Sequence, residues 1–452
     1  MNCELIQETS YLHPVSSQES VRDKTQIHSR SLADIADHTL RERMPVPNIS
    51  RKTMPLLPDV GVMALVPDEW SAPWQTRHHV LSRLARYFQV VWVDPAQEWR
   101  EVLKQRQERT RKSSALGEAS GLEVYTPEFW LPKFYRPAFL AQLSSRWRLR
   151  RAHRSLMRRG CQKIVLYLWR PEFADALLSV AHNRGCYHID DEYSFSDVDM
   201  PLDKSEAELI AKVDQVFVHS RQLYAKKGSI NPNTIYVPNG VAYDAYAKEA
   251  PQPHDLASVP HPRVGYTGYL KRTLDWDLCF HLARKHPEWS LVFVGPVAPS
   301  PEVLEAVKTL SGYPRVYFLG SKSVQQLAAY PQHFDVCIMP YRTDTHSMKY
   351  GYPLKLHEYL ASGRPSVASP LFSLQEFADV VTLASTPEEW SAAITKALCP
   401  DANTQESRAA RQAVARQYDW DLLVSRIARA LVRTLGQEFA DRLAHLTGEQ
   451  DA

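Results

Sequence analysis

Residues 335–341 read DVCIMPY, and residues 352–369 read YPLKLHEYLASGRPSVAS. The first stretch is a short continuous apolar run, and the second places a helix-length segment before another apolar run at Ser366–Ser369. Continuous runs of this length suit strands that are buried on both faces. Pro353 suits the first turn of a helix and Gly363 suits its carboxyl end. The two stretches therefore predict a strand, a helix and a second strand in succession.

The same alternation extends over most of the chain. A first set of apolar, β-branched runs comprises Gly61–Val66, Val90–Val93, Ile164–Trp169, Tyr187–Asp190, Val216–His219 and Thr234–Val237. A second set comprises Arg263–Tyr269, Leu291–Gly295, Val316–Gly320, Val336–Tyr341, Ser366–Ser369 and Val380–Ala384. Helix-length segments such as 274–285, 303–310 and 388–398 separate them. Alternating strands and helices predict parallel sheets covered by helices, so the fold class is α/β with two Rossmann-like, doubly wound domains facing a cleft.

The domain boundaries follow from composition. Residues 1–55 are polar and lack the apolar centre of a secretory signal, so we expect a mobile N-terminal extension. The first domain is predicted over 56–245 and the second over 263–402, with a linker at 246–262 where Pro251, Pro253, Pro260 and Pro262 gather. Residues 403–452 have a helical pattern, with Trp420, Leu423, Ile427 and Leu431 at helical spacing, and we expect them to pack back toward the first domain.

Composition excludes several classes of protein. The chain has 452 residues, 54 Lys+Arg against 51 Asp+Glu and a formal charge of +3, which is too small to indicate nucleic-acid binding. Six cysteines without a CxxC pair exclude a dense disulfide framework and the usual zinc spacings, and they favour a reducing compartment. No run approaches the ~20 apolar residues that a membrane-spanning helix needs. We expect a cytoplasmic protein.

Polar residues follow two strands of the second set. Gly265 and Gly268 allow close approach of a ligand to the backbone, and Lys271 with Arg272 adds positive charge that suits a phosphate. The alternative is a tight turn with two solvated cations. In the quoted helix, Lys355 and Glu358 are three residues apart and share a face, so the pair suits a diphosphate and vicinal sugar hydroxyls. The alternative there is a surface ion pair.

The quoted helix resembles the nucleotide-sugar-binding helix of two-domain GT-B glycosyltransferases, especially the large family 4 group (glycosyl transferases group 1). The matching residues are Glu358, Gly363 and Pro365-Ser366-Val367, and three further stretches match in order: Val237–Val241, Phe318–Gly320 and Asp335–Tyr341. The resemblance implies donor binding by Gly268, Lys271, Arg272, Tyr341, Leu354, Lys355 and Glu358. Many retaining members carry a second Glu eight residues upstream, where this chain has Tyr350, so the donor sugar and the stereochemical outcome stay open.

Two adjacent carboxylates, Asp190 and Asp191, follow a strand of the first set. Their mutual repulsion favours a raised pKa in one of them. The resemblance places acceptor-contacting residues here, so both are candidate catalytic residues. Asp191 would be the general base if the reaction inverts the sugar configuration, and a positioning residue if the reaction retains it. A solvated acidic turn is the alternative. Further acceptor-side candidates are His78, His79, Trp169 and Arg170, for which core packing is the alternative.

Residues 129–160 form a basic and aromatic segment. It holds nine Lys or Arg and no Asp or Glu, and Arg146, Arg150, Arg154 and Arg158 recur every four residues beside Leu140, Leu143 and Trp147. Such a helix is typical of a contact with an anionic membrane surface, and a solvated helix face is the alternative. No nucleic-acid-binding module accompanies the charge.

Together these features predict a glycosyltransferase that moves a sugar from a nucleoside diphosphate to a glycan or lipid-linked acceptor in cell-surface polysaccharide synthesis. The nucleotide sugar is a co-substrate, and we expect no cofactor and no metal site, because cations and helix dipoles meet the diphosphate charge. The enzyme would be cytoplasmic and peripheral on the inner face of the membrane. A nucleotide-sugar epimerase of the same fold and a non-catalytic sugar-nucleotide-binding protein are the alternatives.

Overall fold

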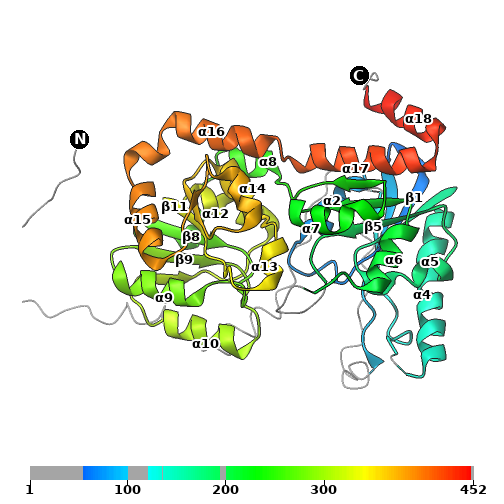
Figure 1. Ribbon diagram of the computed structural model, residues 1–452, viewed down its shortest axis with the longest axis horizontal. Helices are drawn as coiled ribbons and strands as arrows, with labels where there is room; N and C mark the ends of the chain where they lie inside the picture. The colour runs from blue at the N-terminus through cyan, green and yellow to red at the C-terminus, as the bar shows by residue number, and fades with distance from the viewer. Residues whose placement is uncertain (1–53, 100–120, 135, 194–199, 449–452) are drawn as a thin grey trace, which may run out of the picture.

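The protein contains two parallel sheets, each covered by helices on both faces (Figure 1). The computed structural model describes residues 54–99, 121–134, 136–193 and 200–448. The predicted N-terminal extension lies outside the described residues apart from Met54 and Pro55. The prediction of two doubly wound α/β domains is confirmed.

The first sheet has seven strands in the order β3-β2-β1-β4-β5-β6-β7, and every neighbouring pair is parallel. The strands are β1 (Leu57–Leu65), β2 (Phe88–Val93), β3 (Leu122–Tyr125), β4 (Lys163–Leu168), β5 (Arg184–Ile189), β6 (Gln215–Val218) and β7 (Thr234–Tyr236). The order reverses between β1 and β4, so the carboxyl ends of β1, β4 and β5 mark the place where ligands bind in such sheets.

Alternate residues of β1 face opposite apolar layers, as the period of a strand requires. Val62 and Ala64 pack against α2 (Thr76–Leu84), whereas Met63 and Leu65 pack with residues of α4 (Ala138–Arg158). The described part of the domain also contains the helices η1 (Pro171–Phe173), α5 (Ala176–Ser179), α6 (Lys204–Lys212), α7 (Arg221–Lys227) and η2 (Gly228–Ile230). Burial on both faces explains why these strands read as unbroken apolar runs.

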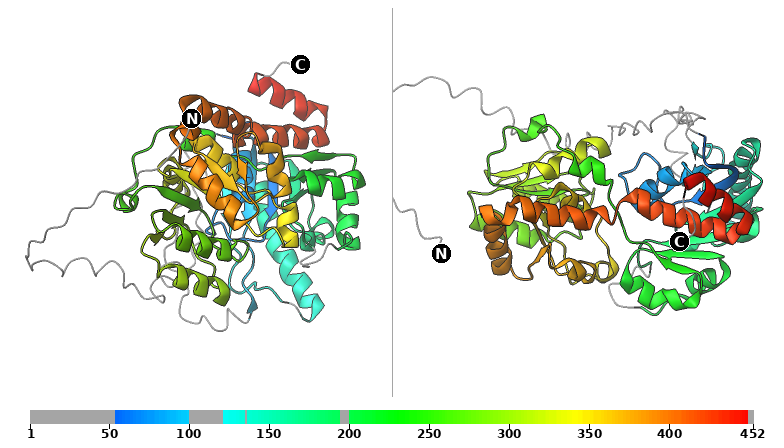
Figure 2. Two further views of the ribbon diagram at one scale, coloured as in Figure 1. Left: turned by 60° about the vertical axis from the view of Figure 1, so that its left-hand side comes forward. Right: turned by 90° about the horizontal axis from the view of Figure 1, so that it is seen from above.

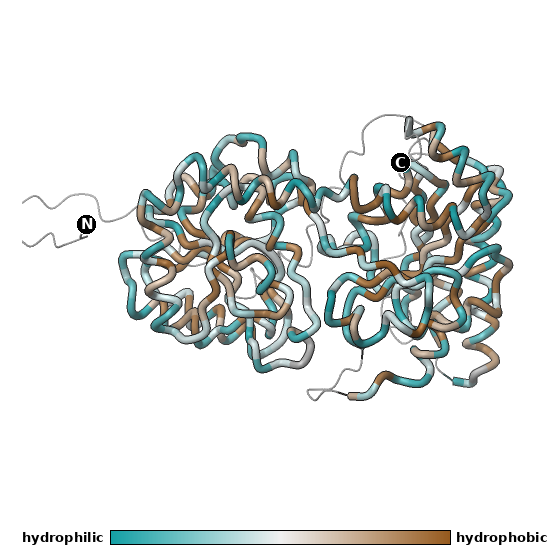
Figure 3. The backbone as a smooth tube through the Cα atoms, turned by 45° about the horizontal axis from the view of Figure 1, so that its top comes forward, coloured by the Kyte–Doolittle hydropathy of each residue, from teal (hydrophilic) through white to brown (hydrophobic). Residues whose placement is uncertain are grey.

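The second sheet has six parallel strands in the order β10-β9-β8-β11-β12-β13. They are β8 (Arg263–Thr267), β9 (Ser290–Val294), β10 (Val316–Phe318), β11 (Val336–Met339), β12 (Ser366–Ala368) and β13 (Thr382–Leu383). Its helices include α9 (Trp276–Lys285), α10 (Pro301–Leu310), α11 (Val324–Leu327), α12 (Ala329–Gln332), α13 (His346–Tyr350), α14 (Lys355–Ser362), η4 (Phe372–Phe377) and α15 (Pro387–Ala397). The apolar stretches run through the middle of each domain, and polar segments lie outside them (Figure 3).

The predicted linker is not a free connector. Residues 246–262 contribute Tyr246, Leu256 and Val259 to the apolar core of the second domain, and the segment contains the end of α8 (Tyr243–Ala247) and the short helix η3 (His254–Leu256). The prolines of this stretch exclude a long helix but not burial of the apolar side chains between them, so the second domain begins before β8.

The C-terminal helices join the two domains. After η5 (Pro400–Asn403), α16 (Gln405–Arg416) lies against α14, and α17 (Trp420–Leu435) crosses to the first domain and packs on α2, followed by α18 (Gln437–Thr447) (Figures 1 and 2). Trp420, Leu423, Ile427 and Leu431 all lie in the apolar layer of the first domain. Gly240 permits the crossing, because a Cβ there would lie 2.5 Å from the Tyr418 carbonyl oxygen.

Truncation of the buried face of α17 tests this attachment. Ile427 is fully buried and Leu422 on the same helix is 54% exposed. We expect Ile427→Ala to lower stability by about 2–5 kcal/mol, since it removes buried methyl groups and leaves a cavity. Leu422→Ala serves as the matched control and should melt within a degree or two of wild type. Equal melting temperatures for the two variants in a thermal denaturation series would contradict the assignment.

Candidate functional site

A buried asparagine ties the two domains together beside the strand ends. Asn239 is 3% exposed; its Oδ1 accepts a hydrogen bond from Thr76 Oγ1 at 2.7 Å, and its Nδ2 donates to the Tyr352 carbonyl oxygen at 2.6 Å. Thr76 begins α2 in the first domain, and Tyr352 lies just before α14 in the second. One side chain therefore sets the position of α14 relative to the first sheet.

Lys355 lies directly over the turn that ends β8. Gly268 has φ +126°, and a Cβ there would lie 2.3 Å from Lys355 Cε and 2.4 Å from Nζ. The ammonium is also 5.3 Å from the centre of the Tyr266 ring. Only glycine leaves room for the lysine at this strand end, so the predicted donor residues Gly268 and Lys355 come together as one unit.

Glu358 lies one turn along α14, close to the hydroxyl group of Tyr246. Burial raises the pKa of Glu358, while Lys355 and the Tyr246 hydroxyl act in the opposite direction. Tyr341, another predicted donor residue, is buried and packs edge to face on Tyr266, at a ring separation of 6.5 Å. Tyr341 therefore supports the ring beneath Lys355 from behind.

Lys271 and Asp191 belong to different domains, and each lies within range of the other's charge. Burial and the charge of Lys355 lower the pKa of Lys271, and Asp191 acts to raise it. The pKa of Asp191 is raised to about 6, first because neighbouring protein atoms displace water from the carboxyl group and then because of the charge of Asp190. The Glu192 N–H, Lys271 and Arg170 oppose the shift. Both side chains are exposed at the surface of the molecule. Arg272 is exposed, and no ion pair to another described residue involves it.

Asp190 differs from its neighbour. Burial acts to raise its pKa, but Arg77, whose Nη1 is 2.6 Å from Oδ2, and the Tyr193 hydroxyl outweigh that effect and lower the pKa. Arg77 also pairs with Asp68. The predicted catalytic pair is therefore unequal, because Asp190 is a buried, paired anion and Asp191 is the carboxylate that faces the second domain.

Three of the predicted acceptor-side residues belong to the core, and the packing alternative describes them. His78 is fully buried with its ring 4.5 Å from that of Trp92, and its pKa is lowered to about 3 by burial and by Arg77. His79 stacks on Trp420 at 5.3 Å. Trp169 is fully buried and stacks on His188 at 4.2 Å. Aromatic rings near a strand end fill the space under the neighbouring helices, and periodicity alone does not separate that role from ligand binding.

Arg170 alone of that group lies near the predicted site. Its guanidinium carbon is 4.4 Å from the centre of the Tyr193 ring, and its charge lowers the pKa of Asp191. It is the acceptor-side candidate that the structure brings close to the carboxylates.

The segment before α14 inserts into the first domain. The side chain of Leu354, predicted to bind donor, packs against the apolar layer around α2. Tyr350 is 5% exposed within the layer on the opposite face of the first sheet, with Lys226 Nζ 5.0 Å from its ring centre. The tyrosine that replaces the upstream Glu therefore serves as an interdomain contact. α14 begins at Lys355, two residues after Pro353, because Leu354 is its N-terminal cap.

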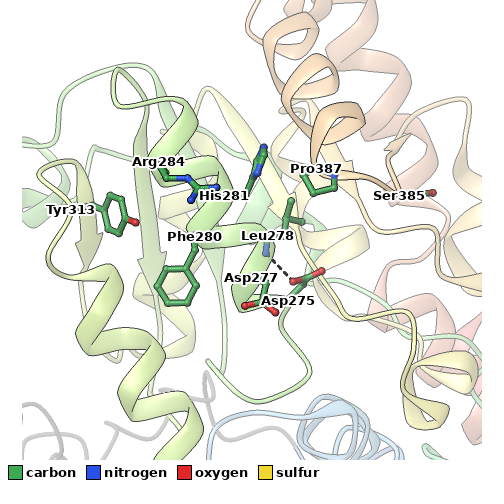
Figure 4. A pocket seen from close by; sticks show the side chains of 9 residues that line it. All are labelled: Asp275, Asp277, Leu278, Phe280, His281, Arg284, Tyr313, Ser385 and Pro387. Carbon is green, nitrogen blue, oxygen red and sulfur yellow. Dashed lines mark hydrogen bonds between the residues drawn. The ribbon is translucent and has the colours of Figure 1, made fainter.

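Two cavities lie in the second domain away from these residues. A cavity of about 320 Å³ is lined by side chains of α9, of the loop after α10 and of the segment that leads into α15 (Figure 4). These are Asp275, Asp277, Leu278, Phe280, His281, Arg284, Tyr313, Ser385 and Pro387. A second, of about 620 Å³, lies between α9, α10 and residues 342–344. Neither of these two cavities is lined by a predicted donor residue.

The α4 helix exposes the predicted cationic stripe. Arg146, Arg150, Arg154 and Arg158 are exposed on the same face as Phe139, Leu143, Trp147 and Met157, which are between 47% and 65% exposed. Arg148 and Arg151 point inward instead, to the Leu131 carbonyl oxygen and to Glu128. In the part of the chain that the structure describes, no helix is both long enough and apolar enough to traverse a bilayer.

Sequence reasoning missed three residues of the site. Tyr246 falls in the expected linker, and its contact with Glu358 joins positions 112 residues apart. The role of Arg77 as the partner of Asp190, and that of Lys227 in a buried ion network near Asp191, depend on contacts between separate helices and strand ends. For Lys227, the one feature of the sequence that could have pointed to a role was the pair Lys226-Lys227 at the end of a short amphipathic segment.

Comparison with known proteins gives the relationship. Residues 262–399 match the family model described as Glycosyl transferases group 1. A curated Bacillus subtilis (strain 168) protein, TuaH, whose name assigns it to teichuronic acid biosynthesis as a glycosyltransferase, is 26% identical over 238 residues, which are 50% of this chain and 59% of that protein. The match thus spans less than two thirds of the curated relative.

Solved structures match over a larger part of the chain. Sucrose-phosphate synthase from Thermosynechococcus elongatus superposes with a TM-score of 0.59 and 17% identity, over 83% of this chain and 99% of that one. Anabaena HepE, determined in complex with UDP and glucose, superposes with a TM-score of 0.56 and 17% identity, over 82% and 99%. At this identity the likeness establishes the fold. The chain therefore has the GT-B fold, and its second domain matches the glycosyl transferases group 1 model, in agreement with the resemblance of the quoted helix.

Proposed function

We propose that the protein is a glycosyltransferase that moves a sugar from a nucleoside diphosphate to a hydroxyl group of a glycan or lipid-linked acceptor in cell-surface polysaccharide synthesis. The observation that carries the proposal is the position of Lys355 over Gly268 at the end of β8, next to Lys271, which lies within range of the charge of Asp191 in the other domain. The family of the second domain, and the named role of TuaH, support the same class of reaction.

The charges suit departure of a nucleoside diphosphate. As the bond from the sugar to the diphosphate breaks, negative charge gathers on the leaving oxygen, and positioned cations stabilise that charge. Lys355 and Lys271 supply two ammonium groups, so we propose that no metal is required. Glu358, close to the Tyr246 hydroxyl, accepts hydrogen bonds from the ribose hydroxyls.

A donor screen tests the proposal. UDP-, GDP-, ADP- and TDP-sugars would be added to the purified protein in a thermal-shift assay, because a ligand that binds only the folded state raises its melting temperature. We expect one nucleotide class to stabilise wild type, with and without EDTA, and Lys355→Met to weaken that binding at least tenfold. Lys308→Met, an exposed lysine on α10, is the matched control.

The products then separate the candidate functions. Sugar transfer to an added acceptor supports the transferase, whereas a changed nucleotide sugar without acceptor indicates an epimerase. Binding without turnover under any acceptor indicates a non-catalytic protein. A protein that no nucleotide sugar stabilises would refute the proposal altogether.

For the acceptor side, we propose that Asp191 takes the proton of the attacking hydroxyl. Its raised pKa of about 6 makes it a better base than an ordinary carboxylate and leaves it ionised at neutral pH. The base is active when deprotonated, so kcat/KM, which reports the pKa of the free enzyme, should reach its maximum above about pH 7 and fall as the pH drops through about 6. Asp191→Asn should lower kcat at least 100-fold with donor binding unchanged, measured by transfer kinetics across pH 5–8.

The matched control for this prediction is Asp214→Asn, a carboxylate at the entrance to β6 that is 40% exposed and should retain turnover. Unchanged turnover in Asp191→Asn, or an acid limb that persists in that variant, would remove Asp191 from the reaction. Retention of the sugar configuration in the product would assign Asp191 to positioning of the acceptor.

We also propose that the exposed face of α4 docks on an anionic, cytoplasmic membrane surface, where a lipid-linked acceptor would be available. Its four exposed arginines each add about 1 kcal/mol near such a surface, and Phe139 and Trp147 suit the headgroup boundary. Because the contact is partly electrostatic, it should weaken as salt rises.

Vesicle co-sedimentation checks this contact. Wild type should pellet with vesicles containing anionic lipid at low salt and be released at about 0.5 M salt, and replacement of Arg146, Arg150, Arg154 and Arg158 by Gln should abolish pelleting. A control with four exposed lysines replaced outside α4 (Lys212, Lys248, Lys285 and Lys308) should still pellet. Binding that ignores both lipid charge and salt would contradict the proposal.

A further inference from the structure

The loop after β5 carries three consecutive carboxylates, and the two that flank Asp191 are tied down. Asp190 is held by Arg77 and Tyr193, as described above. Glu192 is held by two lysines of α7: its Oε1 is 3.1 Å from Lys227 Nζ and its Oε2 is 3.2 Å from Lys226 Nζ. The Glu192 side chain is only 2% exposed, so both of its oxygens depend on these cations.

Lys227 is itself anchored from behind. Its side chain is fully buried, and Nζ lies 2.9 Å from each carboxylate oxygen of Glu206 on α6. The Tyr187 hydroxyl donates to the same carboxylate at 2.9 Å. A buried lysine with two carboxylate partners is costly to move, because breaking one pair leaves an uncompensated charge in the interior. The lysine therefore fixes the distance between α6 and the loop after β5.

The fixed side chain of Glu192 is connected to Asp191 through the backbone. The Glu192 N–H donates to Asp191 Oδ1 at 2.8 Å. We infer that Lys227, anchored by Glu206, is a positioning residue that holds Glu192 so that its backbone N–H orients the Asp191 carboxylate toward the second domain. The base role of Asp191 rests on the proposed function, whereas its orientation does not.

The charged groups around Asp191 determine how its pKa changes when the hydrogen bond from the Glu192 N–H is lost. Asp190 on the same loop raises the pKa of Asp191. Lys271 after β8, Arg170 after β4 and the Glu192 N–H lower it. The Tyr193 hydroxyl also lies within range of the Asp191 charge and is neutral. The N–H stabilises the ionised carboxylate. Loss of that hydrogen bond therefore raises the pKa of Asp191, and the acid limb of the activity moves to higher pH.

Glu192→Met breaks the connection while leaving the Lys227–Glu206 pair intact. The pKa of Asp191 would be measured by carbon-13 NMR of protein labelled at the aspartate carboxyl groups, with its signal identified by its absence in Asp191→Asn. We expect a rise of at least half a unit in Glu192→Met. Glu192→Gln keeps an acceptor for Lys227 and should titrate close to wild type. Glu208→Gln, an exposed carboxylate on α6, is the matched control and should leave the titration unchanged.

A double variant that removes one buried positive and one buried negative group leaves no unpaired charge in the interior and should therefore fold. Lys227→Met with Glu206→Gln removes the anchor behind Glu192, and buried ion pairs are often replaced by neutral groups without loss of stability. We expect the same upward shift, with kcat about tenfold lower and the donor KM within twofold of wild type. An unchanged pKa for Asp191 in either folded variant would overturn the inference. A wild type without turnover would refute the transferase proposal, and the titration would still decide this one.

Discussion

The arrangement of the whole molecule depends on the buried amide of Asn239. Its oxygen and its nitrogen are satisfied by different domains, through Thr76 on α2 and through the backbone just before α14. Leaving either group unpaired in the interior would cost about 1–3 kcal/mol, so the two domains share one preferred orientation at this point. That orientation places the start of α14, and with it Lys355, at the edge where the strands of the first sheet also end.

Around this connection, opposite charges are divided between the domains. The second domain presents Lys355 and Lys271, whose mutual repulsion is relieved when an anion arrives. The first domain presents Asp191, whose neighbours on the same loop are already neutralised by Arg77, Lys226 and Lys227. A diphosphate would meet the cations and an acceptor hydroxyl would meet the carboxylate. The positive charges thus lie in the domain for which we propose donor binding, and the free carboxylate lies in the domain for which we propose acceptor binding.

The interdomain contacts also give Tyr350 a physical role. Its ring is buried in the first domain beneath Lys226, the same lysine that pairs with Glu192. The ammonium group of Lys349 lies 5.6 Å from the same ring, so the ring of Tyr350 makes cation–π contacts with two lysines. The structure therefore accounts for an aromatic residue at this position.

The sequence by itself determined the order and type of most elements. Twelve of the thirteen strands in the described residues follow from mostly apolar runs, because strands covered on both faces leave little room for polar side chains. The exception, β3, is an edge strand whose Leu122-Glu123-Val124-Tyr125 pattern alternates and is too short to stand out. The end of α14 at Gly363 was likewise predictable from the sequence, because a glycine readily adopts the left-handed conformation (φ +72°) of a C-terminal helix cap.

Only the tertiary structure decided which side chains at the strand ends face the domain interface. His78, His79 and Trp169 have the same local pattern as ligand-binding residues, and they pack inward against rings of other elements. These rings are Trp92 on β2, Trp420 on α17 and His188 on β5. Asp190 and Asp191 are chemically identical neighbours, and contacts with Arg77 on α2 separate their roles. Local pattern encodes burial and period, whereas the partner of a charged or aromatic group depends on contacts across more than a hundred residues, which no local pattern contains.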